Sequence, residues 1–329
     1  MEPEVNNGNA TASSGTTFIR LHNTLSKFPW PKSINPHYEE CAKASHDWVA
    51  TFDMFSPKTL AVMWNSLNGY LSSLAWPNLP KNGLQIGCDA MNVFWILEVT
   101  TDRCTSAAEA QTPVDCFMDA LRDPTKPRPE EEWRGASVAQ SLMERMISSG
   151  ASNGCIKRFI KTMQQFCDSL VQEADDRSRG HIRDVEAYFE VRRHTIGLYP
   201  CFAIIQHGME LPDEVYEHDV VRKLEIMAAD MIILDNDLVS YNVEQARGEE
   251  GHNLVRVAMH QFGFGLQESI DWVGKHHAGV LDAFLMLYGT IPVAFPGETD
   301  LHQYAWGVGN WVRANWQWSW EVSSPGLSG

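Results

Sequence analysis

"LPDEVYEHDVVRKLEIMAADMIILDNDLVSYNVEQ", residues 211–245, is the stretch that decides the fold class. It opens on Pro212 with acids in its first turn, where a helix dipole favours negative charge. Residues 227–234 are apolar nearly all round, which predicts a buried helix. Strand signals are poor, because no Asn-Gly turn joins two alternating runs. We therefore expect an all-α fold, one helical bundle around an apolar cavity.

Helix signals also recur towards the start of the chain. An Asn-Pro pair opens "NPHYEECAKASHDWVATF" at residue 35, and Ser56-Pro57 opens another helical pattern. The proline-rich stretch before the first of these predicts an extended segment on the surface. Residues 122–133 predict a loop between two helices. Residues 1–17 are small and polar and predict a disordered tail.

Composition narrows the function classes. The formal charge of −16 argues against binding to nucleic acid or to anionic membranes. An anionic substrate would then require a metal cation or a local arginine cluster. Seven scattered cysteines without a CxxC pair predict free thiols in a reducing, cytoplasmic compartment. We expect no membrane span, because no run approaches the ~20 apolar residues that one needs. A monomer and a homodimer are both compatible with the sequence.

The strongest chemical signal is "NDLVSYNVE", residues 236–244. Asn236, Ser240 and Glu244 follow one another at four-residue intervals, so they share one helix face. An amide oxygen, a hydroxyl and a carboxylate are hard ligands that suit Mg²⁺. The alternative interpretation is the exposed final stretch of an ordinary helix.

A second acidic pair, Glu98 and Asp102, follows the apolar run 93–97 at the same four-residue interval. Two carboxylates near the negative end of a helix are unfavourable without a cation. Such pairs are nevertheless common on solvated faces. Asp115 and Asp119 have the same spacing, but they precede the proline-rich loop and indicate a solvated face or a helix cap.

Two further features could contribute to an anion site. "VRRHTIG", residues 191–197, places two arginines before Gly197, and arginine offers a planar fork to phosphate oxygens. The default interpretation is a basic pair on the surface. Several of the 12 tryptophans cluster in residues 304–320, where aromatic faces could line a cavity and stabilise a cation. Most large aromatic residues are simply core.

Taken together, these segments resemble the class I terpene synthases, and most closely the sesquiterpene synthases of mushrooms. The resemblance spans about residues 18–320. It includes "GCDAMNVFWILEVTTD", "VRRHTIG", "LDNDLVSYNVEQARGEEGHN" and "GNWVRAN" in the family's order. It implies an all-α domain over residues 18–321, and three Mg²⁺ ions, with Mn²⁺ as an alternative, that bind a prenyl diphosphate.

The resemblance also implies roles for individual residues. Asn236, Ser240 and Glu244 match the second metal motif, and Glu98 with Asp102 match the Asp-rich motif. For the remaining site residues, it implies a diphosphate-sensing role for Arg193, an effector role for Gly197 and a place on the pocket floor for Trp318. Phe94 is a further candidate catalytic residue.

Two departures from the family pattern affect the expected chemistry. The Asp-rich motif begins with Glu98-Val99 where the family has Asp and a second acid, and Ser324-Pro325 stand where it has a C-terminal Arg-Tyr pair. Residues 322–329 would thus be a tail without that pair. We expect a looser closed state and easier entry of water. The product would then be an acyclic tertiary alcohol such as linalool or nerolidol, or cyclic sesquiterpenes.

Two competing interpretations stay open. One is a catalytically weak or inactive relative that binds diphosphates or acts as a helical interaction protein, which both departures favour. The other is a chain-elongating prenyltransferase. That class requires a second Asp-rich motif, and this chain has Asn, Ser and Glu in its place.

Overall fold

The described part of the chain, residues 19–248 and 250–323 of a computed structural model, is helical and contains no strand. Its first eight helices are α1 (Tyr38–Ala50), α2 (Pro57–Asn65), α3 (Asn68–Ala75), α4 (Lys81–Thr101), α5 (Ala107–Arg122), α6 (Gly135–Ser148), α7 (Asn153–Arg179) and α8 (Val185–Thr195). There follow α9 (Leu198–Ile205), α10 (Asp213–Tyr216), α11 (Asp219–Arg247), η1 (Glu250–His252), α12 (Leu254–Phe262), α13 (Leu266–Tyr288), α14 (Ile291–Ala294) and α15 (Thr299–Ser323). The all-α prediction is confirmed. The predicted tail 1–17 lies outside the described residues.

Local caps account for several helix boundaries. Ser56 caps α2, with its hydroxyl accepting a hydrogen bond from the Thr59 backbone N–H at 3.2 Å. The predicted loop after residue 122 is confirmed, since α5 ends at Arg122 and α6 begins at Gly135. The first helix begins at Tyr38, three residues later than predicted. Asn35 instead donates its amide to the main-chain oxygens of Trp76 and Leu79.

The stretch 211–245 forms two helices and not one, which corrects the sequence prediction. Pro212 precedes the short α10, and α11 starts afresh at Asp219. His218 separates them, because its Nδ1 accepts the Val220 backbone N–H at 3.2 Å and so caps α11.

The segment before α1 is extended, as predicted, but it does not simply lie on the surface. Phe28 and Trp30 are buried, and the Trp30 ring donates its N–H to the main-chain oxygen of Trp306 at 3.0 Å. The segment thereby fastens α15 to the rest of the bundle.

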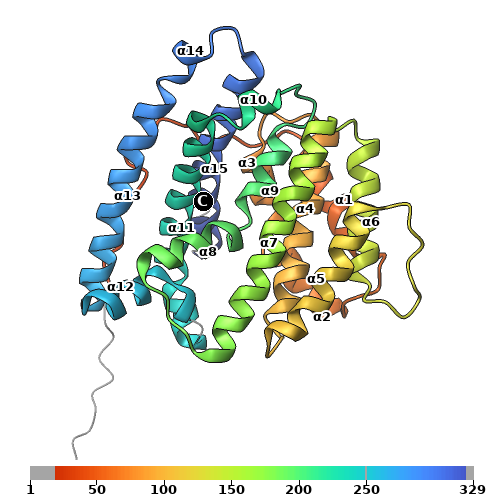
Figure 1. Ribbon diagram of the computed structural model, residues 1–329, viewed down its shortest axis with the longest axis horizontal. Helices are drawn as coiled ribbons and strands as arrows, with labels where there is room; N and C mark the ends of the chain where they lie inside the picture. Colours follow the sequence, from red (N-terminus) through yellow and green to blue (C-terminus); the bar gives the residue numbers. More distant parts are fainter. Residues whose placement is uncertain (1–18, 249, 324–329) are drawn as a thin grey trace, which may run out of the picture.

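The long helices run side by side, with α13 at one edge of the molecule and α5 and α6 at the other (Figure 1). Helix α11 packs against α13 and α15, and α7 packs against α5, α8 and α9. The C-terminal ends of α4, α7 and α11 all point to the lower end of the bundle in Figure 1. The same end therefore receives both predicted metal motifs.

The core consists of two apolar clusters. The larger one fills most of the bundle. The smaller one lies between α8, α11, α12 and α13 and includes Tyr188, Phe189, Leu234 and Leu238. Residues of α11 belong to both clusters, so apolar packing holds this helix in place up to its polar C-terminal turns.

The segment Leu266–Ala294 is long and apolar enough to span a membrane by length and composition, which the sequence analysis did not expect. It contains α13, whose inner side packs into the helical bundle. His277 of α13 lies with its Nε2 3.4 Å from the buried Asp235 carboxylate of α11. One helix of this kind is weak evidence for a membrane span.

Candidate active site

Asn236, Ser240 and Glu244 follow one another along the last turns of α11, and all three are half-buried. The apolar residues 227–234 before them are buried apart from the half-buried Met227, as predicted. Polar side chains that continue such a helix require polar partners. The structure supplies these partners from α8 and from the start of α12.

A buried asparagine, Asn253, donates hydrogen bonds to the residues of the α11 motif. Its amide nitrogen donates to Glu244 Oε2 at 3.0 Å and to the main-chain oxygen of Asp237 at 2.8 Å, and it lies 3.5 Å from Ser240 Oγ. Its amide oxygen caps α12. We did not predict this residue. The signal was an Asn directly before the apolar run "LVRVA", which is a typical helix start.

The two arginines of α8 have different partners. Arg192 donates to Asn236 Oδ1 at 2.8 Å and lies 3.4 Å from the buried Asp237 carboxylate. Arg193 instead forms a two-point pair with Asp230, at 2.6 and 2.9 Å, and its guanidinium lies over the Phe189 ring. The structure thus brings Arg192 to the α11 motif. Arg193, the arginine singled out in the sequence, is occupied elsewhere.

Gly197 lies at the break between α8 and α9. Its φ of +71° is a left-handed conformation that strains other residues, while an added Cβ would meet only ordinary contact with Phe166, at 3.5 Å. Glycine is therefore favoured here by the left-handed backbone conformation and not by a lack of space for a side chain. Thr195 ends α8, and its hydroxyl accepts a long hydrogen bond, 3.4 Å, from Arg192. Arg192, which contacts the α11 motif, is therefore also hydrogen-bonded to the last residue of α8.

Glu98 and Asp102 stand at the end of α4, where Asp102 is the cap residue. Water reaches the Glu98 side chain, yet protein surrounds it on most sides. Burial, and secondly the Asp102 carboxylate, raise the pKa of Glu98 to about 7, while the charge of Arg192 opposes the shift. Asp102 is exposed and lies 3.5 Å from the Arg177 guanidinium of α7.

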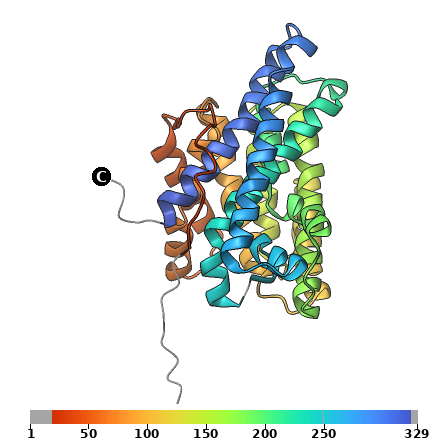
Figure 2. The same ribbon diagram turned by 90° about the vertical axis from the view of Figure 1, so that its left-hand side faces the viewer.

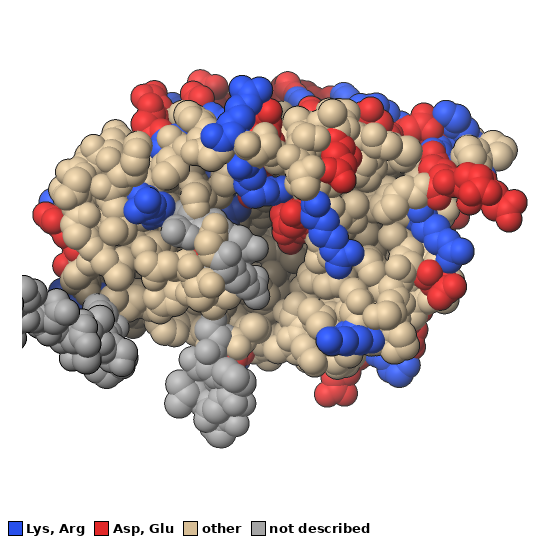
Figure 3. All heavy atoms as spheres, turned by 90° about the horizontal axis from the view of Figure 1, so that it is seen from below, with Lys and Arg blue, Asp and Glu red and all other residues tan. Residues whose placement is uncertain are grey.

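Although burial raises the pKa of Glu98, the charge of Arg192 acts to lower it, which indicates that the end of α4 lies near the arginine that contacts the α11 motif. Glu173 of α7 adds a third acid there, because its charge also acts on both of those groups. Figure 3 shows this end of the molecule hollowed near its centre, with acidic and basic side chains at the rim. Acids from α4 and α7 thus face an arginine and the oxygen ligands of α11.

The residues fit divalent metal ions. No group of three or more His, Cys, Asp or Glu side chains suited to a metal occurs in the described residues, since the α11 set depends on Asn and Ser. Asn236 Oδ1 and Glu244 Oε2 nevertheless both accept hydrogen bonds from N–H groups, a position that a cation can take. Oxygen atoms of this kind, opposite carboxylates, are what Mg²⁺ binds.

The two predicted aromatic residues occupy different parts of the bundle. Phe94 lies one turn before Glu98, is buried, and meets Phe166 of α7 edge to face at 5.3 Å. Trp318 lies near the end of α15, is half-buried, and donates its ring N–H to the main-chain oxygen of Ser66 at 3.2 Å. Phe94 is therefore at the base of the α4 motif, while Trp318 joins α15 to the link between α2 and α3.

Asp115 and Asp119 form the solvated face predicted for them. Asp119 accepts hydrogen bonds from Lys126 and Arg128, which lower its pKa, and Asp115 accepts one from Gln111. They take no part in the site.

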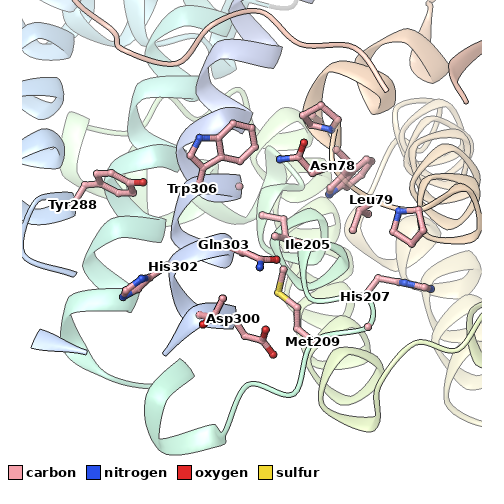
Figure 4. Close-up of a pocket in the computed structure, with 17 residues that line it drawn as sticks. Asn78, Leu79, Ile205, His207, Met209, Tyr288, Asp300, His302, Gln303 and Trp306 are labelled. Carbon is pink, nitrogen blue, oxygen red and sulfur yellow. The ribbon is translucent and has the colours of Figure 1, made fainter. Parts of the chain in front are cut away.

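A separate pocket of 680 Å³ lies at the opposite end of the bundle. Its walls come from the α3–α4 link, the end of α9, α13 and the start of α15, and Figure 4 shows Asn78, His207, Asp300 and Gln303 around it. Its lining contains no lysine or arginine, and none of the predicted site residues lines it. It is therefore unsuited to a diphosphate.

Comparison with known proteins shows the family to which the chain is related. The model of "Terpene synthase family 2, C-terminal metal binding" matches residues 89–282. A Delta(6)-protoilludene synthase of Stereum hirsutum is 42% identical over 92% of this chain and 82% of its own length. One from Armillaria gallica is 40% identical, over 92% and 88%. Sesquiterpene synthase 9 of Postia placenta is 37% identical, over 93% and 88%.

Solved structures share the fold at low sequence identity. An ancestral reconstruction, the SVS_A2 protein, has a TM-score of 0.81 at 22% identity and covers 89% of this chain and 88% of its own. Linalool/nerolidol synthase from Streptomyces clavuligerus has a TM-score of 0.78 at 20% identity, with coverage of 89% and 98%.

Proposed function

Because the chain belongs to the terpene synthase family and is an enzyme of the sesquiterpene cyclase type, we propose that it ionises a prenyl diphosphate between α4, α8 and α11. The observation that carries this proposal is the 2.8 Å hydrogen bond from Arg192 to Asn236. It joins a phosphate-binding side chain to a metal-ligand motif, opposite the acids of α4. That combination suits an anionic leaving group with its counterions.

Two sets of residues would hold the metal ions. Asn236, Ser240 and Glu244 form one set, and Glu98 with Asp102 forms the other, for three Mg²⁺ ions or Mn²⁺ in their place. Bound divalent ions act as Lewis acids that neutralise the charge growing on the departing diphosphate. Asp102 would exchange its present partner, Arg177, for a cation.

Side chains of the protein would bind the diphosphate, position α8 and exclude water. Arg192 is placed to give the departing diphosphate a charge-assisted hydrogen bond, and we assign it the sensing role that the resemblance implied for Arg193. Arg193 would hold α8 against α11 through Asp230. The aromatic face of Phe94, one turn before Glu98, would border the carbocation and keep water away from it, while the pocket position of Trp318 rests on the resemblance alone.

The substrate we propose is farnesyl diphosphate, geranyl diphosphate or both. The products are cyclic sesquiterpenes or an acyclic tertiary alcohol of the linalool or nerolidol type. The names of the Stereum and Armillaria relatives support the cyclic outcome. The extra methylene of Glu98 supports the alcohol, because a displaced carboxylate would leave room for water. The Ser324-Pro325 position lies outside the described residues.

Incubation with geranyl, farnesyl and geranylgeranyl diphosphates in the presence of Mg²⁺ tests the proposal, with products identified by gas chromatography and mass spectrometry. We expect volatile terpenes from farnesyl diphosphate and their loss in Asn236→Ala. Asp115→Ala serves as the matched control, because it removes an acid of the decoy pair. Full activity of Asn236→Ala would contradict the metal assignment.

A catalytically weak relative is the second candidate, because Glu98-Val99 departs from the acidic pair of the family. Thermal unfolding combined with the product assay separates the two. Inorganic diphosphate with Mg²⁺ raises the unfolding temperature of a diphosphate-binding protein whether or not it turns over substrate. A shift without product would favour the weak relative. Absence of both would contradict the proposed site altogether.

A further inference from the structure

Helix α13 has two different faces. Its inner face packs against the rest of the bundle through Ile270, Val273, His277, Leu281 and Phe284. The opposite face is exposed and carries Lys275, Gly279, Asp282 and Met286, at positions i, i+4, i+7 and i+11. Figures 1 and 2 show α13 at the outer edge of the molecule, in front of the other helices when that edge faces the viewer.

The outer face combines two charged residues, Lys275 and Asp282, with exposed apolar side chains near its C-terminal end. The side chain of Met286 is 77% exposed, and that of Val293 in α14 is 83% exposed. Only 22% of the most apolar part of the segment Leu266–Ala294 is buried. Exposed apolar side chains that lie together on one surface mark an interaction site.

A groove of 580 Å³ runs beside this face, between α11 and α13. Its α11 wall consists of Ile226, Met227 and Asp230. Its α13 wall consists of Trp272, Lys275, His276, Gly279, Val280 and Ala283, so the groove is mainly apolar with two charged residues in its lining. Apolar side chains of a partner would fill it. A methionine suits this purpose, because its flexible thioether adapts to an irregular gap.

The charges on the outer face identify the partner. Among the described residues, Lys275 and Asp282 have no ion-pair partner, and they stand two turns apart on either side of Ala278 and Gly279. We propose that α13 docks against α13 of a second copy of this chain, antiparallel across a two-fold axis near Gly279. Each Lys275 then faces Asp282 of the other copy. Each Met286 lies towards the groove of the other.

Other features of the chain favour a second copy over a lipid surface. The net charge of −16 disfavours an anionic membrane, and Lys275 and Asp282 would be expensive to place in lipid. A 23-residue helix is ~35 Å long, enough to supply the ~800 Å² per partner that a stable interface buries. Two-fold symmetry is also the commonest arrangement of homo-oligomers.

Sedimentation velocity of the full chain at rising micromolar concentration tests this interface. We expect a dimer for the natural sequence. Met286→Glu should sediment as a monomer, while Ile147→Glu, the same apolar-to-charged change at an exposed position of α6, should leave the dimer intact. Gly279→Trp should also give a monomer. Its Cβ would point into open space, so the fold of the single chain tolerates it.

Exchanging the charges of Lys275 and Asp282 tests the proposed pairing directly. Lys275→Glu and Asp282→Lys should each weaken the dimer about tenfold, and the double exchange should restore it, because every pair then regains opposite charges. Circular dichroism checks that each variant folds. A monomer at all concentrations, or a double exchange no better than the single ones, overturns the proposal. So does a monomer that floats with phosphatidylcholine vesicles through Met286, which would assign the face to a membrane.

Discussion

Two neighbouring arginines, Arg192 and Arg193, have separate roles at the residue scale. Successive residues on a helix point about 100° apart, so one faces Asn236 and the other faces Asp230. We expect Arg192→Ala to lower turnover of farnesyl diphosphate about 10²–10³-fold, as loss of a charge-stabilising donor does. Stability should fall as well, because Arg192 is also the cation beside the buried Asp237 carboxylate, so activity is compared per folded molecule.

Arg193→Ala is the matched control for that prediction. It leaves the buried Asp230 without its cation, so we expect a loss of about 2 kcal/mol in the free energy of unfolding. Activity per folded molecule should stay near that of the natural chain. Kinetics and denaturant unfolding measured on both variants separate the roles, and the reverse pattern would return the sensing role to Arg193.

Glu98 should make the metal-free protein sensitive to pH. Its pKa is raised from 4.5 to about 7, so the folded protein binds this proton more tightly than the unfolded chain does. The resulting stability is present below about pH 4.5 and is lost as pH rises to about 7. We expect a loss on the order of 1 kcal/mol, reduced by the access of water to this side chain.

Urea unfolding in the presence of a chelator, from about pH 5 to about pH 8, measures this effect. Glu98→Gln should flatten the dependence, because glutamine does not titrate. An unchanged pH profile in that variant would show that another group is responsible.

At the scale of elements, the break between α8 and α9 depends on Gly197. Gly197→Ala should cost about 1 kcal/mol of stability, because its φ is positive. It should also lower activity, since the break positions the last turn of α8 and with it Arg192. Gly180→Ala is the control: it has a similar φ, +62°, at the end of α7. Equal stability losses with unequal activity losses are the expected result.

The link between α11 and α12 depends on Asn253. Asn253→Ala removes both the helix cap and the donor to Glu244, and should cost about 2 kcal/mol. Asn253→Ser keeps a capping hydroxyl but is too short to reach Glu244. We expect it to recover part of the stability while the Mg²⁺ concentration for half-maximal activity stays raised. Equal metal requirements in the serine variant and the natural chain would remove Asn253 from the site.

At the scale of the whole molecule, we expect the fold to be independent of metal. The core is built from two apolar clusters, and the residues that we propose as metal ligands belong to neither of them. A chelator should therefore abolish activity, while the helical circular dichroism and the unfolding temperature stay unchanged. Added Mg²⁺ should restore turnover. Unfolding on chelation would show instead that a metal ion holds the bundle together.

Local patterns determined the fold class and part of the site. The buried run 227–234 and the common face of Asn236, Ser240 and Glu244 follow from helical periodicity, which depends only on neighbouring residues. The cap at Ser56 and the loop after residue 122 are local for the same reason. These features were predictable without any knowledge of packing.

The tertiary structure alone decided how helices face one another. The rotation of α8 about its axis turns Arg192 towards Asn236 and Arg193 towards Asp230, and packing of α11 against α12 brings Asn253 to Glu244. The burial of Trp30 and the exposed outer face of α13 likewise depend on which surfaces meet. Contacts between residues distant in sequence set these choices, because a helical pattern states which residues share a face but not what that face meets.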